Sequence, residues 1–303
     1  MKIAAAAYPI DWHNRWNDYV GKLRVWVRTA AEQGAELLVF PEYAAMELAS
    51  LAGEDNARDL ERSIDAVTAR IKDVDELHGS LAREYRAHIL AATGPIRRED
   101  GKAVDRARLF APDGSHGVQD KLIMTRFERE SWGIVPGAGQ RVFETALGRI
   151  GVLTGYDAEF PLLARALVAA GAEVLLVPSS TDSPRGYARM RAAVMARALE
   201  GQCVVAHAVT VGEADWLRAA AKSTGTAAIY GPPDVGFPED GVIAAGKPNT
   251  AGWVHAEVSL EAVRAVRADG AVLNHRDWAE QDARLDGVET VALGLAAAEQ
   301  ARG

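Results

Sequence analysis

A glutamate stands at the end of an apolar run near the N-terminus. Residues Leu37 to Leu48 read LLVFPEYAAMEL, and Glu42 follows a predicted strand that stops at Pro41. In α/β folds, binding and catalytic residues gather at the carboxyl ends of strands. A carboxylate there, desolvated by Phe40 and Tyr43, would have a raised pKa and would suit general-base catalysis. A solvated loop glutamate is the alternative interpretation of Glu42 taken alone.

A lysine in an apolar run marks a second segment. Residues 119–137 read QDKLIMTRFERESWGIVPG, and Lys121 opens the run KLIM, which we predict to be a strand. Strands rarely bury a lysine without a partner, and one chemical use of such a charge is to stabilise an oxyanion. Glu130 follows in the same segment. Its alternative interpretation is a helix-surface charge beside Arg126 and Arg129.

The third segment is an elbow between a predicted strand and a predicted helix. Residues 151–161 read GVLTGYDAEFP, and Gly155 stands at the turn, where such elbows often carry a reactive side chain. Tyr156 presents its backbone N–H directly after the turn, a position that donates to an oxyanion in nucleophile-elbow enzymes. Asp157 and Glu159 have the alternative role of capping the helix that follows. The elbow therefore has the form of an active-site turn without a reactive atom.

Strands and helices alternate along the chain and must position these segments. The apolar runs predict strands at residues 2–8, 36–40, 88–93, 106–124 (a hairpin), 142–154 (a hairpin), 173–177, 203–209, 227–230 and 252–258. Helical spacing predicts helices at residues 16–33, 54–87 (with a break near 73–79), 162–170, 187–199 and 260–267. We predict one α/β domain over residues 1–280 with two apolar sheets, each covered on its outside by helices. Residues 281–303 form a polar, then Ala-rich tail that is either disordered or packed on a partner subunit.

The composition narrows the class of protein. The 303 residues carry 34 Lys and Arg against 42 Asp and Glu, a net charge of −8, which argues against nucleic acid or an anionic membrane as the main partner. No uncharged apolar stretch approaches the length of a membrane span. The lone Cys203 fits a reducing cytoplasm, so we expect a cytoplasmic protein. The seven histidines are scattered along the chain, and no metal site is predicted.

Together the three segments resemble those of the nitrilase superfamily, the carbon–nitrogen hydrolases. The glutamate motif of that family is similar to FPE at residues 40–42, and its lysine motif is similar to QDKLIM around Lys121. The second glutamate of the family matches Glu130 in ERESWGIVPG. The nucleophile motif of the family reads Cys-Tyr-Asp-x-x-Phe-Pro, whereas this chain has GYDAEFP. Further similar stretches lie at residues 171–180, 196–208 and 224–234, so the resemblance covers nearly the whole chain.

The resemblance implies a fold, a mechanism and a set of roles. The implied fold is an α/β, four-layer α-β-β-α sandwich that dimerises through its outer layer, or forms a larger homo-oligomer, and needs no cofactor and no metal. Glu42 would act as general base and acid, and Lys121 with the Tyr156 N–H would stabilise the tetrahedral oxyanion. Glu130 would position the substrate or tune Lys121. A thiolate at position 155 would form a thioester that water then cleaves.

Gly155 departs from that scheme, because a glycine offers no atom to acylate. Cys203 is no substitute, since it opens an apolar strand and is predicted to be a buried, inert thiol. Two explanations stay open: a hydrolase whose cysteine was replaced, or a natural family member that lost hydrolysis and kept a binding pocket. The intact residues around position 155 favour the first. A third interpretation places a water in a void beside Gly155, where Glu42 would activate it.

The substrate is the least determined feature. The residues predicted to line its pocket are Tyr43, Phe127, Trp132 and the loop 179–183, in which Ser179 and Ser180 are singled out. A core position is the alternative for Trp132 and the other aromatic residues. The resemblance implies a small molecule with a C–N bond, and a small carboxamide is our expectation, with carbamoyl compounds and nitriles as alternatives. Arg185 either meets a substrate carboxylate or is solvated. A non-catalytic ligand-binding or interaction protein on the same scaffold is the rival function.

Overall fold

The computed structural model describes residues 1–285, 287–291 and 293. Its strands are β1 (Lys2–Pro9), β2 (Leu37–Val39), β3 (His88–Leu90), β4 (Gly94–Arg97), β5 (Ala103–Phe110), β6 (His116–Asp120), β7 (Val142–Thr145), β8 (Gly148–Val152), β9 (Val174–Ser179), β10 (Val204–Glu213), β11 (Lys222–Ser223), β12 (Ala228–Tyr230), β13 (Val242–Ala245) and β14 (Gly252–Glu257). Its α-helices are α1 (Trp16–Glu32), α2 (Glu54–Arg58), α3 (Leu60–Tyr85), α4 (Pro161–Ala169), α5 (Pro184–Gly201), α6 (Leu260–Asp269) and α7 (Asn274–Asp277). Short 3-10 or π turns are η1 (Ala44–Ala52), η2 (Glu128–Trp132), η3 (Gly155–Glu159), η4 (Arg218–Ala220) and η5 (Trp278–Arg284).

The strands form a path that passes through the pairing of β1 with β10. The order is β4-β5-β3-β2-β1-β10-β9-β8-β7, and β6 extends it at β5. β1 pairs in parallel with β2 over Ile3 to Ala5, and with β10 only near its carboxyl end, from Ala7 to Pro9. The remaining edges of β1 and β10 pair antiparallel with β14 and β12. The path therefore has two halves, one centred on β1 and one on β10.

Alternate residues of β1 show how these halves pack. Ile3, Ala5 and Ala7 belong to a buried cluster that also holds Val39 from one half and Leu176 from the other. Because residues two apart in a strand share a face, these three side chains point to the same side. The cluster is the inner layer, enclosed between the two halves of the strand path. Ala4, Ala6 and Tyr8 point the other way, into a second cluster. The period of two along one all-apolar strand therefore fills two different layers.

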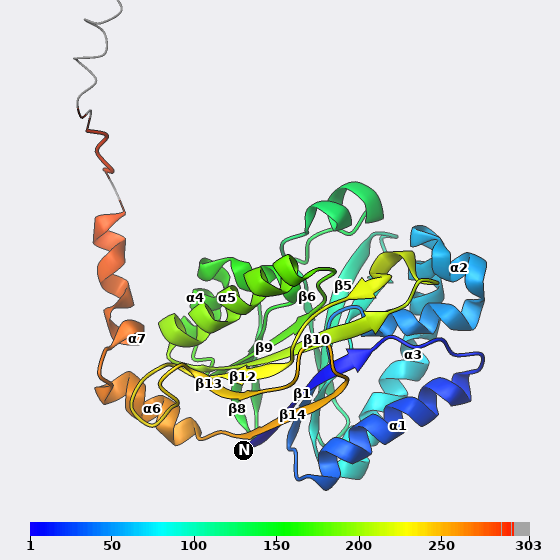
Figure 1. The fold of residues 1–303 in the computed structure, drawn as a ribbon, viewed down its shortest axis with the longest axis horizontal. Coiled ribbons are helices and arrows are strands. Elements are labelled where there is room, and N and C mark those ends of the chain that lie inside the picture. The colour runs from blue at the N-terminus through cyan, green and yellow to red at the C-terminus, as the bar shows by residue number, and fades with distance from the viewer. Residues whose placement is uncertain (286, 292, 294–303) are drawn as a thin grey trace, which may run out of the picture.

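Helices cover the outer faces. The second cluster packs β1 and β2 against α1 and α3, and a third packs β9 and β10 against α4 and α5. Figure 1 shows α1 and α3 on one side of the strands, with α4 and α5 on the opposite side. The predicted four-layer α-β-β-α sandwich is confirmed.

Two local predictions were wrong. The helix predicted over residues 54–87 is not broken near 73–79, since α3 runs unbroken from Leu60 to Tyr85. The break lies at Asp59, whose carboxylate accepts a hydrogen bond from the Arg62 N–H at 2.9 Å and so caps α3.

The second error concerns KLIM, which is not a strand. β6 ends at Asp120, one residue before Lys121. The next two backbone N–H groups, those of Leu122 and Ile123, donate to the Asp157 carboxylate and not to a neighbouring strand. Lys121 therefore stands directly after a strand end, as Glu42 does.

The C-terminal part of the chain lies against the α4 layer. No helix among the described residues is long and apolar enough to cross a membrane. η5 crosses the predicted domain boundary at residue 281, and the Arg165 guanidinium lies 4.9 Å from the centre of the Trp278 ring. Of the predicted tail, residues 286, 292 and 294–303 lie outside the described residues.

Candidate active site

Three strand ends bring Glu42, Lys121 and Gly155 together. Glu42 follows β2, Lys121 follows β6, and Gly155 opens η3 after β8. The Lys121 ammonium donates to Glu42 Oε1 at 2.7 Å, and both side chains are almost fully buried. The built Cβ position of Gly155 lies within 3 Å of the Glu42 carboxylate. The structure thus assembles these three predicted residues from positions up to 113 apart in the chain, between 42 and 155.

Glu42 is fixed by the backbone on both sides. The Thr93 N–H donates to the Pro41 carbonyl at 3.1 Å, and Tyr43 turns the chain into η1 with a φ of +61°. The Ser180 N–H donates to Glu42 Oε2 at 2.9 Å, so each carboxylate oxygen has one donor. A left-handed conformation is costly for a tyrosine and persists only where the surrounding structure enforces it. The orientation of Glu42 is therefore set before any ligand binds.

The second glutamate of the site is Glu128. Its Oε1 accepts from the Lys121 ammonium at 2.6 Å, its Oε2 accepts from the Thr125 N–H at 2.6 Å, and the Tyr43 hydroxyl also donates to it. Glu130, predicted for this place, is exposed and forms an i,i+4 ion pair with Arg126. This prediction is corrected, because the π-helical turn η2 directs Glu128 inward and leaves Glu130 in solvent.

Burial and the charges of neighbouring side chains set the pKa values of Glu42, Lys121 and Glu128. Burial raises the pKa of Glu42 to about 7, although Lys121 opposes that shift. Burial alone would lower the pKa of Lys121, but Glu42 and Glu128 raise it above its ordinary value. Burial also opposes ionisation of Glu128, yet the Lys121 ammonium lowers the pKa of that carboxyl below its ordinary value. The lysine is therefore a permanent cation, and Glu42 is the group that titrates near neutrality.

The Glu42 carboxylate stands where a side chain of residue 155 would begin. Gly155 has a φ of +47°, and a Cβ added to it would lie 2.4 and 2.6 Å from the two Glu42 carboxylate oxygens. Gly155 and Glu42 both line the cavity described below, so a water beside them stays a prediction. Any side chain at position 155 requires the Glu42 carboxylate to shift, because a Cβ there would be closer to it than van der Waals contact.

Asp157 joins the elbow to the lysine segment. Its carboxylate accepts from the Leu122 N–H at 3.0 Å and from the Ile123 N–H at 2.7 Å. Burial raises the pKa of Asp157 to about 6, against the opposing effect of these N–H groups. The capping interpretation is wrong for Asp157, since α4 begins at Pro161 with no side-chain cap. Glu159, the other candidate cap, pairs with Arg189 at 2.7 Å.

The pair of Glu42 and Lys121 lies at the wall of a cavity of about 490 Å³. Tyr43, Phe127 and Ser180 of the predicted wall residues line it, and so do Thr181 and Asp182 of the predicted loop 179–183. The Tyr156 backbone follows Gly155 into the same lining. The cavity is large enough for a small-molecule ligand.

Two predicted wall residues do not line the cavity. Trp132 is buried, donates its indole N–H to the Leu60 carbonyl at 3.0 Å, and packs behind Tyr43 with ring centres 5.1 Å apart. Ser179 faces the opposite side of β9 from Ser180, and its hydroxyl lies 2.7 Å from His207 Nε2 in the core. Strand alternation is the reason, because neighbouring residues of one strand point to opposite faces.

Sequence reasoning missed several residues of the site. Glu159, Arg189, Arg218 and Lys222 also line the cavity. They lie on loops and helix ends with no pattern that sets them apart from surface charges. Arg185, proposed as a carboxylate partner, is exposed and does not line it.

Asp105 was also missed, although it carried a signal. It is a fully buried carboxyl group in the apolar run AVDRARLF of β5. Glu42, Asp105 and Glu128 offer oxygens within 4.8 Å of one another, a spacing that could hold a metal ion. The Lys121 ammonium already binds two of the three carboxylates and supplies a positive charge there.

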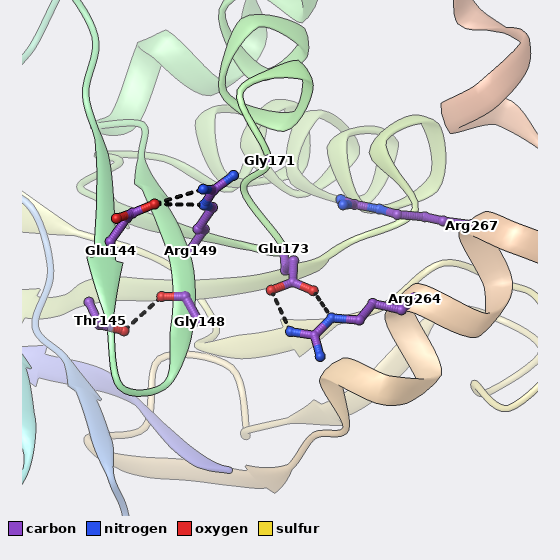
Figure 2. Close-up of a pocket in the computed structure, with 8 residues that line it drawn as sticks. All are labelled: Glu144, Thr145, Gly148, Arg149, Gly171, Glu173, Arg264 and Arg267. Atoms are coloured by element: carbon purple, nitrogen blue, oxygen red, sulfur yellow. Dashed lines mark hydrogen bonds and ion pairs between the residues drawn. The ribbon is translucent and has the colours of Figure 1, made fainter.

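A second hollow lies at the β7–β8 hairpin and α6 (Figure 2). Its charged side chains already bind one another: Arg149 pairs with Glu144, and Arg264 pairs with Glu173. Arg267 donates to backbone carbonyls, including that of Ala172 at 2.8 Å. Because these cations are engaged, the hollow offers a ligand little charge to bind.

Cys203 lies away from the site, in the core under α5. It is fully buried, and burial raises the pKa of its thiol to about 12. A neutral thiol is a poor nucleophile, so the prediction that Cys203 is a buried, inert thiol is confirmed.

Comparison with known proteins shows the family of the chain. The family model described as "Carbon-nitrogen hydrolase" matches residues 2–268. The chain therefore belongs to the carbon–nitrogen hydrolase family, within the nitrilase superfamily.

Its curated relatives include several kinds of hydrolase. A probable hydrolase of Bacillus subtilis, YhcX, is 30% identical over 277 residues, which cover 91% of this chain and 53% of that protein. The aliphatic nitrilase of Sinorhizobium fredii is 29% identical over 59% of each chain. The chain spans about half the length of the curated relatives it matches.

Solved structures share the fold. A carbon–nitrogen hydrolase from Helicobacter pylori G27 superposes with a TM-score of 0.73 at 18% identity, covering 88% of this chain and 92% of that one. The amidase from Nesterenkonia sp. superposes with a TM-score of 0.63 at 22% identity, covering 92% of this chain. One structure of that amidase shows acrylamide added to its active-site cysteine.

Proposed function

We propose that the cavity beside Glu42 and Lys121 binds a small carboxamide, and that this chain hydrolyses it at most very slowly. The reaction of this lineage would be amide plus water to acid plus ammonia or amine. The observation that carries the proposal is the buried ion pair of Lys121 with Glu42 at the cavity wall, next to Gly155. The site then has a base and an oxyanion partner but lacks the thiol for acyl transfer.

The roles follow from what each group offers. The Lys121 ammonium and the Tyr156 N–H would bind the carbonyl oxygen and stabilise negative charge on it. Glu42, with a pKa of about 7, would accept a proton from a nucleophile or return one to a leaving amine. Glu128 would hold Lys121 in place without touching the substrate.

Gly155 decides how far the reaction goes. Thioester formation requires sulfur at this position, and loss of a covalent nucleophile typically costs on the order of 10⁴-fold or more in kcat. Binding does not require the sulfur. We therefore expect carboxamides to bind with almost no turnover.

Replacing Gly155 with cysteine tests this proposal. We expect Gly155→Cys to release ammonia from a panel of small amides at least about 10³-fold faster than the unaltered chain. The measurement is ammonia release under saturating substrate, with far-UV circular dichroism to verify folding. Gly155→Ala is the matched control, because it adds the same Cβ beside Glu42 without a nucleophile.

The control separates chemistry from packing. If Gly155→Ala is as active as Gly155→Cys, the thiol has no role and the proposed mechanism is wrong. A folded Gly155→Cys protein that binds amides without releasing ammonia would favour the rival function, a non-catalytic ligand-binding protein. The close approach of Glu42 to Gly155 is the observation that favours this rival, since the carboxylate stands where a nucleophile would begin.

Assembly and location complete the proposal. We expect a cytoplasmic homodimer, or a larger homo-oligomer, formed through the outer helical layer of α4 and α5. Leu162 on α4 and Leu199 on α5 are exposed apolar side chains on that layer. Exposed apolar side chains on an outer layer favour contact with another subunit.

A further inference from the structure

Asp105 is the carboxyl group of the site that no ammonium, guanidinium or backbone N–H binds. Its side chain is fully buried, and among the described residues only the neutral Thr93 hydroxyl is placed to hydrogen-bond with it. Glu42 by contrast accepts from the Lys121 ammonium and the Ser180 N–H. An ionised carboxylate without donors in a buried position is strongly unfavourable.

The net charge of the cluster also argues against an ionised Asp105. Glu42, Asp105 and Glu128 surround one ammonium, so full ionisation would leave a net charge of −2 within a few ångströms in the interior. Two carboxylates that share a buried site rarely both stay ionised, and here there are three. In the folded protein, protonation of one of the three carboxylates is therefore favourable.

The groups that face Asp105 come from four segments. Besides Glu42, Lys121 and Glu128, the Thr93 hydroxyl lies near it from the loop between β3 and β4. The two cations that follow along β5 are already paired, Arg106 with Asp120 at 2.6 Å and Arg108 with Asp75 at 2.8 Å. Lys121 is likewise already engaged with the two glutamates. No described cation is therefore left to stabilise an Asp105 carboxylate.

We propose that Asp105 is a protonated, neutral carboxylic acid in the folded protein and acts as a positioning residue for Lys121. In the neutral state it does not compete with Glu42 and Glu128 for the ammonium, so Lys121 keeps both of its hydrogen bonds. Burial, followed by the charge of Glu42, also raises the pKa of Asp105 well above its ordinary value. This inference does not depend on which ligand the cavity binds.

Infrared spectroscopy tests it directly. The C=O stretch of a protonated carboxyl group absorbs at a higher infrared frequency than the stretches of a carboxylate. Labelling all aspartates with ¹³C shifts this band only if an aspartate carries the proton. At about pH 8, above the pKa of about 7 for Glu42 and about 6 for Asp157, we expect one such band, shifted by labelled aspartate. It should vanish in Asp105→Asn and persist in Glu42→Gln. A missing band, or one that vanishes in Glu42→Gln and not in Asp105→Asn, would overturn the proposal.

Unfolding measured against pH gives a second test. A carboxyl that is protonated when folded and ionised when unfolded makes the protein less stable as pH rises, because the folded state binds the extra proton. The ratio of the unfolding constants of the unaltered protein and Asp105→Asn should therefore rise about tenfold per pH unit above about pH 5. Asp113→Asn is the matched control, since two bonds from Ser115 lower the pKa of Asp113.

The two outcomes are distinct. For Asp113→Asn the ratio should stay constant above about pH 5, because that group is ionised in both states. A constant ratio for Asp105→Asn would show that Asp105 is ionised when folded, contrary to the proposal. Either result leaves the test with Gly155→Cys unaffected.

Discussion

Lys121 is held between two carboxylates that differ in their other partners. Glu42 is also bound by a backbone N–H and faces the cavity, whereas Glu128 is bound by a backbone N–H and the Tyr43 hydroxyl behind it. Of the two, Glu42 is therefore free to exchange protons with a ligand. Under the proposed function, Glu128 would act on a ligand through Lys121 alone.

Glu128 and Glu130 form a natural pair for mutation. Replacing Glu128 by Gln leaves the buried ammonium with one carboxylate, and we expect a loss of about 3 kcal/mol in the free energy of unfolding. Glu130→Gln removes an exposed ion pair and should change it by less than about 0.5 kcal/mol. Urea unfolding of both variants measures these values. Equal losses would contradict the assignment of Glu128 as the buried partner.

At the scale of elements, four segments after strand ends are bound to one another, two by two, and the Lys121–Glu42 pair joins the two pairs. The lysine segment after β6 donates two backbone N–H groups to Asp157 in η3, and the segment after β2 accepts from Ser180 after β9. Such cross-links between loops hold catalytic side chains more firmly than each loop would by itself. Removing one cross-link should loosen the neighbour it holds.

Asp157→Ala removes the link between the elbow and Lys121. It leaves the N–H groups of Leu122 and Ile123 buried without acceptors, and we expect a loss of about 2–4 kcal/mol in stability. Hydrogen exchange at these two amides should become markedly faster. Glu159→Ala, in the same turn, breaks a pair with the exposed Arg189 and should cost about 1 kcal/mol or less. Unchanged exchange at Leu122 in Asp157→Ala would show that the link does not hold the segment.

At the scale of the molecule, the two sheet halves share one inner layer and expose two helical layers. One outer layer is α1 with α3, and the other is α4 with α5 (Figure 1). The site lies where strand ends of both halves meet, so its geometry depends on how the halves pack. The outer layers are then available for contacts with other subunits.

The proposed assembly through α4 and α5 has a matched test. Leu162→Glu places a charge on an exposed side chain of α4, and we expect it to lower the mass of the assembly. Val25→Glu makes the same change on α1, the opposite layer, and should leave the mass unchanged. Light scattering at micromolar concentration measures both. If both variants keep the mass of the unaltered protein, the assembly does not use Leu162.

Short motifs were enough to predict much of the protein. The apolar runs predicted an α/β domain with many strands, and the resemblance carried by the glutamate, lysine and elbow segments implied the four layers and the three residues that do meet. This succeeded because local hydrophobic period and turn chemistry are set by neighbouring residues. The same reasoning also identified Cys203 as a buried thiol.

Tertiary packing alone decided which nearby residue faces inward and which charges meet. Glu128 and not Glu130 reaches Lys121, because the packing of η2 buries Glu128 and leaves Glu130 exposed, and Asp105 joins the site from β5, where a carboxyl group among apolar residues was its one signal. The place where a Cβ of residue 155 would lie is filled by the Glu42 carboxylate, which Lys121 and Ser180 hold there. The sequence determined that the elbow lacks a nucleophile. The tertiary structure determined what stands in its place, since that depends on contacts between segments far apart in the chain.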